Sequence, residues 1–275
     1  MHEKKYKIGL IGAGNMGQAL LAGLLKRGTY RREDINACTK QAKSARALAA
    51  AMGIHTGNDP REVVLNSELV ILAVKPYMAE RVLQPLQGCW DDVRAVVSIM
   101  TGVPISFLEE QVGRTIPVYR AMPNTPATVG QGMTVIARGS QGAEEMDARV
   151  EEVFQAVGHT AWIEEDLMNA STGLSGAGPA YVYLFIEAMS DAGVKVGIPR
   201  DLALLMAAQT VKGAAEMVLA SGMHPAQLKD QVTTPAGVTI DGIMEMEDLN
   251  LRSAVIRSVV KATERAYALF KQSVQ

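Results

Sequence analysis

Cysteine and histidine are scarce in this chain of 275 residues, which holds two cysteines and four histidines. Cys38 and Cys89 lie far apart and lack the C-x-x-C spacing of a zinc site, so we expect buried thiols, no disulfide framework and a reducing compartment. The histidines are scattered without the spacing of metal ligands, and no Ser-His-Asp or Cys-His arrangement stands out. The sequence therefore predicts no metal site and no catalytic histidine.

An excess of charge of one sign and a long apolar run are also missing. The chain has 27 Lys and Arg against 29 Asp and Glu, with a net charge of -2. No basic stripe is interleaved with aromatic residues, which argues against a nucleic-acid partner. No apolar run reaches about 18 residues, and the first residues show no signal-peptide core. We expect a cytoplasmic protein that does not bind a membrane.

The most informative segment that is present is a glycine-rich turn near the N-terminus. An apolar run ending at Ile11 leads into G-x-G-x-x-G and then into a helical pattern over 15–27. Gly12 permits a tight turn, Gly14 lets the backbone approach a pyrophosphate, and Gly17 lets the helix pack on the strand. Because strand, turn and helix are all in place, the motif predicts a dinucleotide site formed by Gly12, Ala13, Gly14, Asn15, Met16 and Gly17.

The chain has two halves with different secondary-structure patterns. Up to about residue 164, short β-rich runs alternate with helical patterns, which is typical of a mostly parallel, doubly wound sheet. From residue 166 on the strand signal vanishes, and prolines precede apolar helical runs at 179–196, 199–220 and 250–272. We therefore predict an α/β protein with a Rossmann-like domain at 1–164 and an all-helical domain at 165–275 that dimerises.

In the first half, Gly, Pro, Asp and Asn between apolar runs mark the ends of the predicted strands and helices. Strands are expected over 7–11, 34–38, 69–74, 94–98, 115–121, 132–138 and 159–163. Helices are expected over 15–27, 41–52, 60–66, 77–87, 105–111 and 142–157.

The end of the second strand bears on the choice of nicotinamide cofactor. An acid there would bind the ribose 2′-hydroxyl of NAD, but this chain has Thr39 and Lys40 instead. Hydroxyl and cationic groups suit a 2′-phosphate better, so NADPH is preferred, with NADH still allowed. The alternative is that these residues simply open a solvated surface helix.

Two further strand ends carry candidate cofactor contacts, because ligands bind outside the carboxyl ends of parallel strands. The first is the run Ala73, Val74, Lys75 and Pro76, where Lys75 either faces the cofactor or extends into solvent. The second is Met122–Pro126, in which two prolines stiffen the loop around Asn124. Asn124 is interpreted as a nicotinamide or substrate contact, against the alternative of a rigid turn.

A second glycine-rich helix start lies at the domain junction. Gly173, Gly176 and Gly178 match the G-x-x-G-x-G-x-x-x-K pattern that 3-hydroxyacid dehydrogenases show in their interdomain helix. Val182 stands at the position of the lysine, which in those enzymes is the catalytic acid/base. The absence of this lysine argues against reduction of a carbonyl, because that reaction needs a titrating group to supply the proton of the hydroxyl.

The last candidate segment runs from Thr234 to Thr239. Pro235 stands where a helix would begin, so the N–H groups of Ala236, Gly237 and Val238 are expected to be free to bind a carboxylate. Thr239 lies one turn further in and offers a hydroxyl that accepts from a ring N–H. Taken alone, the segment also reads as simple helix capping by the threonine before Pro235.

Together these motifs resemble those of pyrroline-5-carboxylate reductases, which carry out the last step of proline biosynthesis. The resemblance runs the whole length and is carried by residues 8–17, 73–76, 122–126, 172–181 and 227–239. It implies an oxidoreductase acting on a CH–NH group, with a small-molecule substrate and a cleft closed by the partner subunit. It also implies a homodimer and rings of dimers as a further level of assembly.

The resemblance also implies roles for individual residues. The threonine matching Thr239 accepts the iminium N–H, and Thr234 with the backbone from Ala236 to Val238 holds the carboxylate. A protonated cyclic imine is already a good hydride acceptor, so no catalytic His or Lys is needed. The family often has Ser or Gly where this chain has Thr234 and Ala236, which leaves the carboxylate donor open.

Two other function classes remain open at this point. A different imine or keto-acid reductase of the hydroxyacid type shares the architecture, although Val182 weakens that reading. An NADP-sensing protein without catalysis would keep the glycine turn but would not need the segment from Thr234 to Thr239.

Overall fold

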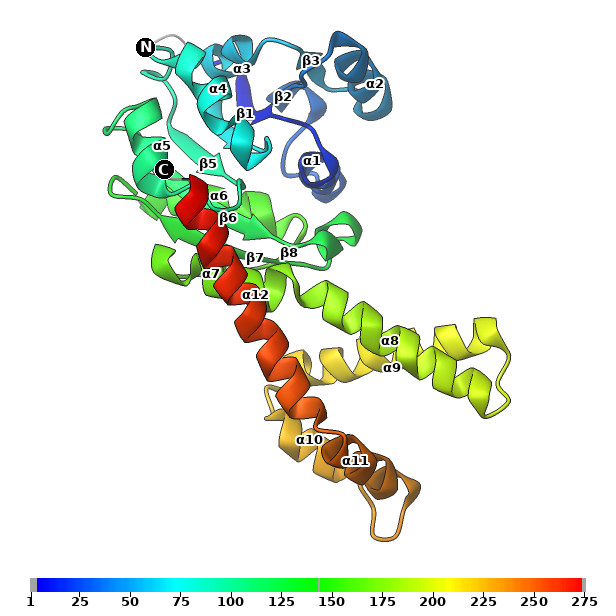
Figure 1. The fold of residues 1–275 in the computed structure, drawn as a ribbon. Coiled ribbons are helices and arrows are strands. Elements are labelled where there is room, and N and C mark those ends of the chain that lie inside the picture. Colours follow the sequence, from blue (N-terminus) through cyan, green and yellow to red (C-terminus); the bar gives the residue numbers. More distant parts are fainter. Residues whose placement is uncertain (1–3, 143, 274–275) are drawn as a thin grey trace. The chain divides into compact units, whose positions relative to one another are not determined.

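The computed structural model describes residues 4–142 and 144–273, with side chains as far as residue 268. Its contacts divide the chain into two compact units, one of Met1–Gly176 with Ala262–Gln275 and one of Ala177–Lys261. The first unit holds a β-sheet with its covering helices, and the second unit consists of helices (Figure 1).

The sheet has eight strands in the order β3-β2-β1-β4-β5-β6-β7-β8, and all neighbours are parallel except β6 and β7. That pair is antiparallel because its connection, 124–131, is too short for a parallel crossover of a dozen residues or more. The strand order reverses between β1 and β4, which are hydrogen-bonded to each other. The strands are β1 (Tyr6–Ile11), β2 (Ile35–Cys38), β3 (His55–Gly57), β4 (Ser67–Leu72), β5 (Ala95–Ser98), β6 (Val118–Pro123), β7 (Gly132–Arg138) and β8 (Gly158–Trp162).

Helices cover both faces of this sheet, which defines the doubly wound arrangement. One hydrophobic cluster includes buried residues of α3 (Pro60–Asn66), α4 (Ala79–Leu83) and α5 (Ile105–Val112). The other cluster includes buried residues of α1 (Asn15–Arg27), α2 (Ala42–Met52) and α6 (Glu144–Gln155). The central strands, buried on both faces, are accordingly continuous apolar runs, such as LVIL in β4.

Most of the predicted elements of this half are confirmed, and three differences have local causes. The predicted helix 77–87 is broken into the 3₁₀ turn η2 (Pro76–Met78), α4 and the 3₁₀ turn η3 (Gln84–Leu86), because Pro85 cannot continue an α-helix. The strand expected at 115–121 lies at 118–123 and ends on a proline, where no further ladder N–H is needed. β3 was not predicted.

After Trp162, the described residues contain no strand, as the sequence predicts. The chain passes through η5 (Glu165–Leu167), α7 (Met168–Ser171) and a π-helical turn, η6 (Thr172–Gly176), before the second unit begins. The remaining helices are α8 (Gly178–Lys195), α9 (Arg200–Ser221), α10 (Pro225–Gln231), α11 (Val238–Asp248) and α12 (Leu251–Ser273). The expected fold class, a Rossmann-like sheet followed by helices, is confirmed.

Helix α9 exposes large apolar side chains. Among its described side chains only Ala203 and Ala207 are buried, while Leu205 is 64% and Leu219 68% exposed. By length and composition α9 could also cross a membrane. Exposed apolar side chains of this size point to a further apolar surface that covers them.

Candidate functional site

The turn between β1 and α1 has the close contacts that require its glycines. A Cβ at Gly12, where φ is +97°, would lie 2.8 Å from a Val74 methyl group and 2.9 Å from the Ala73 carbonyl carbon. A Cβ at Gly17 would lie 2.6 Å from the Gly12 oxygen. At Gly14, by contrast, a Cβ would meet no described atom within 4 Å, which leaves the backbone open to a ligand. This cradle fits the pyrophosphate of NAD(P)H.

The start of α1 points unpaired N–H groups at the same place. Gly14 is the N-cap, and its carbonyl accepts the first helical bond from the Gln18 N–H at 2.9 Å. The N–H groups of Asn15, Met16 and Gly17 therefore have no partner within the helix. No acidic residue lies in the first turn, so no carboxylate offsets the positive end of the helix dipole.

The end of β2 lies beside this turn. The Gly12 N–H donates to the Cys38 carbonyl at 3.0 Å, and the next residue, Thr39, donates its own N–H to Gly57 at 3.1 Å. The Thr39 hydroxyl donates its hydrogen to the Gln41 carbonyl at 2.9 Å. Toward a ligand, this hydroxyl can therefore act only as a hydrogen-bond acceptor. Lys40 is exposed next to it. Both candidate residues for the 2′-phosphate thus lie beside the glycine turn.

The run after β4 contacts the glycine turn from the other side. The Ala73 N–H donates to the Ile11 carbonyl at 2.8 Å, and the backbone of Ala73 lies against Gly12. The Lys75 carbonyl accepts from the Met78 N–H at 2.9 Å, which opens η2 at Pro76. The Lys75 side chain is exposed. The structure therefore brings Ala73 and Val74 against the cofactor turn.

Asn124, after β6, uses its side chain inside the protein. Its Oδ1 accepts from the Met133 N–H of β7 at 2.9 Å, and its Nδ2 donates to the Ser175 carbonyl at 3.0 Å. Only 9% of the residue is exposed. One amide hydrogen is left for any ligand, so the two hydrogen bonds favour a role in holding Ser175 over the predicted contact with nicotinamide or substrate.

In the second unit, the segment from Thr234 to Thr239 differs in detail from the prediction. Helix α11 begins at Val238 and not at Pro235, and Ala236 has a φ of 57°. The Gly237 N–H donates to the Thr234 carbonyl at 3.0 Å, so the expectation that it is free was wrong. The N–H groups without a helical partner are those of Val238, Thr239 and Ile240. Thr239 is the second residue of the helix, not one turn in.

Thr234 lies over the start of that helix. A Cβ at Gly237 would clash with the Thr234 hydroxyl oxygen, which explains why a glycine is the N-cap there. The neighbouring Thr233 is committed elsewhere, because its hydroxyl donates to the Lys229 carbonyl at 2.7 Å. Thr234 and Thr239 are therefore the two hydroxyls of the segment that flank the free N–H groups.

Burial raises the pKa of the Cys38 thiol to about 12, so the thiol stays neutral near pH 7. Cys89 is also buried and free, which confirms the expected core thiols.

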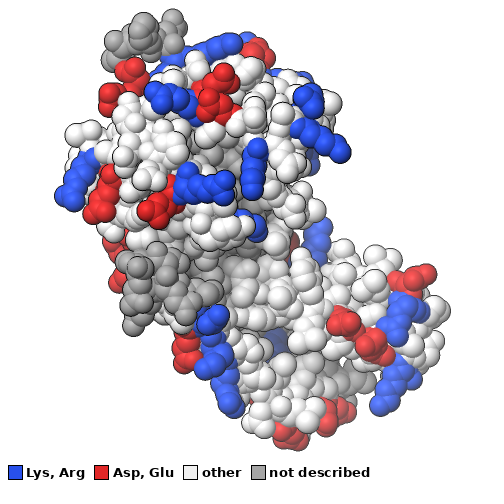
Figure 2. Space-filling model, turned by 45° about the horizontal axis from the view of Figure 1, so that its top comes forward, with Lys and Arg blue, Asp and Glu red and all other residues white. Residues whose placement is uncertain are grey.

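Within the described part of the chain, no group of three or more His, Cys, Asp or Glu side chains could hold a metal ion. On the face shown in Figure 2, acidic and basic side chains are mixed.

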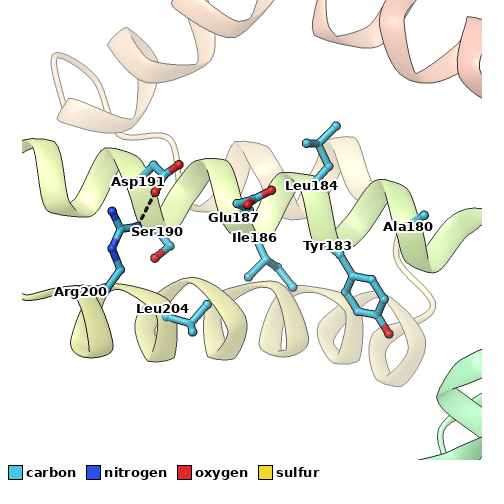
Figure 3. Close-up of a pocket in the computed structure, with 9 residues that line it drawn as sticks. All are labelled: Ala180, Tyr183, Leu184, Ile186, Glu187, Ser190, Asp191, Arg200 and Leu204. Atoms are coloured by element: carbon cyan, nitrogen blue, oxygen red, sulfur yellow. Dashed lines mark hydrogen bonds and ion pairs between the residues drawn. The ribbon is translucent and has the colours of Figure 1, made fainter.

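A groove of about 800 Å³ lies on the hairpin of α8 and α9 and contains none of the predicted site residues. Figure 3 shows Ile186 pointing from α8 toward α9, with the ion pair of Asp191 and Arg200 at one end. Leu184 and Leu204 line the groove and are 67% and 50% exposed. The groove thus combines exposed apolar side chains with charged ones at one end.

One partly buried ion pair could not be predicted from the sequence. Arg120 of β6, 3% exposed at its side chain, contacts Glu165 at 2.7 Å, and the same carboxylate oxygen accepts from the Ile105 N–H at 2.8 Å. Nothing in the sequence around Arg120 indicates that it pairs with Glu165, which lies 45 residues further along the chain. The pair joins β6 and the start of α5 to the segment that precedes the helices.

Two family models match the chain. Residues 165–269 match pyrroline-5-carboxylate reductase dimerisation, and residues 7–102 match NADP oxidoreductase, coenzyme F420-dependent. The first match covers α8 to α11 and most of α12, and the second covers the glycine turn and strands β1 to β5.

Similar proteins span the full length. A pyrroline-5-carboxylate reductase from Methanosarcina acetivorans is 43% identical over 97% of this chain and 98% of its own. The structure of a pyrroline-5-carboxylate reductase from Coxiella burnetii has a TM-score of 0.91 at 33% identity, covering 97% of this chain and 99% of that one. The Plasmodium falciparum enzyme, solved with NADP bound, has a TM-score of 0.86 at 32% identity, with coverage of 97% and 99%.

Proposed function

The chain belongs to the pyrroline-5-carboxylate reductase family, and from this premise we propose how its residues carry the reaction. The protein reduces L-1-pyrroline-5-carboxylate to L-proline with NAD(P)H as the cofactor. The observation that carries this function is the match to reductases of this name over 97% of the chain. The carbonyl-reductase and NADP-sensing alternatives have no comparable support.

The cofactor supplies a hydride, and the residues of the first unit bind and orient it. The open backbone at Gly14 admits the pyrophosphate, and the N–H groups of Asn15, Met16 and Gly17 donate to it. Lys40, supported by the Thr39 hydroxyl, pairs with a 2′-phosphate and so favours NADPH. The Ala73 backbone and a Val74 methyl group pack against Gly12 and fix the turn.

The substrate carboxylate binds at the start of α11. Three backbone N–H groups, those of Val238, Thr239 and Ile240, have no helical partner and face a carboxylate at the positive end of the helix dipole. The Thr234 hydroxyl lies over Gly237 and adds a donor. Ala236, in the left-handed conformation, turns the chain so that the helix can start at Val238.

Thr239 holds the reacting nitrogen. Its hydroxyl oxygen accepts a hydrogen bond from the iminium N–H and thereby orients the ring carbon that receives the hydride. The substrate nitrogen already carries its proton, so no side chain has to deliver one. For this reason the proposed site needs no catalytic histidine.

The family match also supports an assembly of subunits. The chain is a homo-oligomer, and the exposed apolar surface of α9 and of the α8–α9 groove is buried between subunits of a dimer. We further propose that dimers assemble into a larger oligomer, that the protein is cytoplasmic, and that α9 contacts a partner subunit and no membrane. Cofactor binding belongs to 1–164, and dimerisation and substrate binding to 165–275.

The experiment that tests the function is an NADPH-oxidation assay with pyrroline-5-carboxylate against a panel of 2-keto and 3-keto acids. Turnover with the imine alone is expected, and preference for a keto acid would refute the proposal. Thr239→Ala tests the site. Loss of one hydrogen bond to a charged group, about 1.5–3 kcal/mol, lowers kcat/KM about 10- to 100-fold while NADPH affinity is unchanged.

Thr233→Ala is the matched control for that variant. Its hydroxyl caps the end of α10 by donating to Lys229, so its removal leaves kcat/KM near that of the wild type. Equal losses in both variants would show that the effect comes from folding and not from the iminium contact.

A further inference from the structure

The amide of Asn124 joins two parts of the first unit that are distant in sequence. Its Oδ1 accepts from Met133 of β7, which fixes the orientation of the amide plane. Its Nδ2 then donates to the Ser175 carbonyl, 51 residues further along the chain. Both bonds are close to 3 Å, and the residue is 9% exposed, so solvent competes little for them.

The sequence explains why the Ser175 carbonyl needs this donor. In an α-helix the carbonyl of Ser175 would accept from the residue four positions later, which is Pro179 and has no N–H. The next N–H, that of Ala180, donates to the Ala177 carbonyl at 3.0 Å instead. Ser175 is partly buried, and a carbonyl there without a donor is costly, so the Asn124 amide takes the place of the missing N–H.

The carbonyl belongs to a turn of unusual geometry. Residues Thr172–Gly176 form the π-helical turn η6, and such turns occur frequently at functional sites. The hydroxyls of Thr172 and Ser175 donate to carbonyls one turn earlier, at 2.8 Å and 3.0 Å. Those bonds lie within the segment, whereas the Asn124 bond attaches the segment to the sheet.

The point of attachment lies on the cofactor edge. Strands β1, β4, β5 and β6 are parallel, so their carboxyl ends meet at one edge, and Asn124 directly follows the last of them. Two strand spacings, roughly 10 Å, separate the end of β6 from that of β4. Because Thr39 and Lys40 place the adenosine half at β2, the nicotinamide half lies on the side of β4 to β6.

We propose that Asn124 is a positioning residue for hydride transfer. Its amide replaces the N–H that Pro179 lacks, and in this way it holds the turn at 172–176 against the nicotinamide side of the sheet edge. The inference rests on the proposed function, since it assigns Asn124 an effect on the reduction of pyrroline-5-carboxylate. It differs from a direct cofactor contact, because it acts through Ser175.

Asn124→Asp tests this through pH. A carboxylate still accepts from Met133 but repels the Ser175 carbonyl, whereas the protonated acid both accepts and donates as the amide does. Burial raises the pKa of such a carboxyl. We expect kcat to be about 10- to 100-fold below that of the wild type at high pH, with KM and NADPH affinity nearly unchanged. The kcat ratio to wild type should rise as pH falls from about 9 to about 5.5.

Asn66→Asp is the matched control, because the Asn66 amide also donates to a helix carbonyl, that of Glu62 at 2.7 Å, but on α3. Its kcat ratio to wild type should not change with pH. Normalising to the wild type removes the protonation of the imine itself from the comparison.

A double-mutant cycle supplies a second test that does not depend on the pKa of an introduced acid. Pro179→Ala restores an N–H that can donate to Ser175, so Asn124→Ala should lower kcat less in the Pro179→Ala background than in the wild type. Circular dichroism and sedimentation check that each variant is folded and assembled.

Recovery of kcat at low pH or by Pro179→Ala supports the proposal. It is overturned if kcat of the Asn124 variants equals that of the wild type, if only NADPH affinity falls, or if neither low pH nor Pro179→Ala restores kcat. Absence of turnover in the wild type itself would refute the proposed function instead, which separates the two failures.

Discussion

The variant Gly14→Ala separates the contribution of the glycine turn to folding from its contribution to cofactor binding. Gly14 has a φ of -73°, a value that alanine adopts without strain, and an added Cβ meets no described atom within 4 Å. Gly12 and Gly17 lack this property, because a Cβ there would lie 2.8 Å and 2.6 Å from its nearest neighbour. Gly14 is therefore the position of the motif where a methyl group hinders only the ligand.

The expected magnitudes differ for the two properties. A glycine replaced by alanine at a compatible φ gains about 0.4–1 kcal/mol through the unfolded chain, while alanine is a poorer N-cap by roughly the same amount. These effects offset, so the free energy of unfolding should change by less than about 1 kcal/mol. A methyl group forced against a close-packed pyrophosphate costs about 1–3 kcal/mol, which raises the NADPH Kd about 5- to 150-fold.

Fluorescence titration with NADPH and thermal unfolding without it measure these two effects. Gly28→Ala is the control with the opposite expectation, since Gly28 has a φ of 76° after α1 but lies away from the turn. Its stability should fall by about 1–2 kcal/mol while its NADPH Kd stays unchanged. If Gly14→Ala binds NADPH as tightly as the wild type, the pyrophosphate does not approach Gly14 and the reasoning fails.

Three further results are expected. Lys40→Asp should weaken NADPH far more than NADH, by about 1.5–3 kcal/mol for the lost charge-assisted bond, and a wild-type preference for NADH would contradict this. Leu205→Glu, on the exposed face of α9, should dissociate the oligomer and abolish turnover, whereas a fully active monomer in sedimentation would argue against the dimer interface. The pH profile of kcat/KM should follow protonation of the imine, and a single His or Lys substitution that abolishes turnover with affinities intact would refute that.

The sequence predicted best where glycine and proline mark the ends of apolar runs. The helix predicted at 15–27 is α1 residue for residue, and that at 60–66 is α3. In both cases a local cause determines the start, Gly14 as N-cap in one and Asp59 followed by Pro60 in the other. The local sequence therefore carries the information for the glycine turn and for its position.

Tertiary pairing decided the elements that were missed. β3 has three residues, His55, Thr56 and Gly57, with no apolar alternation, and it exists because β2 offers it an edge. The Arg120–Glu165 pair and the Asn124–Ser175 bond join residues 45 and 51 positions apart. Neither contact follows from a recognisable spacing of residues in the sequence. Only the proline four residues after Ser175 indicates that the Ser175 carbonyl needs a donor from elsewhere.

The start of α11 shows how a local misprediction can point to function. Among the described residues other than glycine, only Ala236 and Asn250 have a positive φ. Asparagine tolerates that conformation, but for alanine it costs about 1–2 kcal/mol. With Ala236 in this conformation the helix starts at Val238 and not at Pro235, and the Thr234 hydroxyl lies over the N-cap, Gly237. Strain of this kind persists where a site needs it. An observation independent of the family resemblance thus points to the same segment that we propose for the substrate carboxylate.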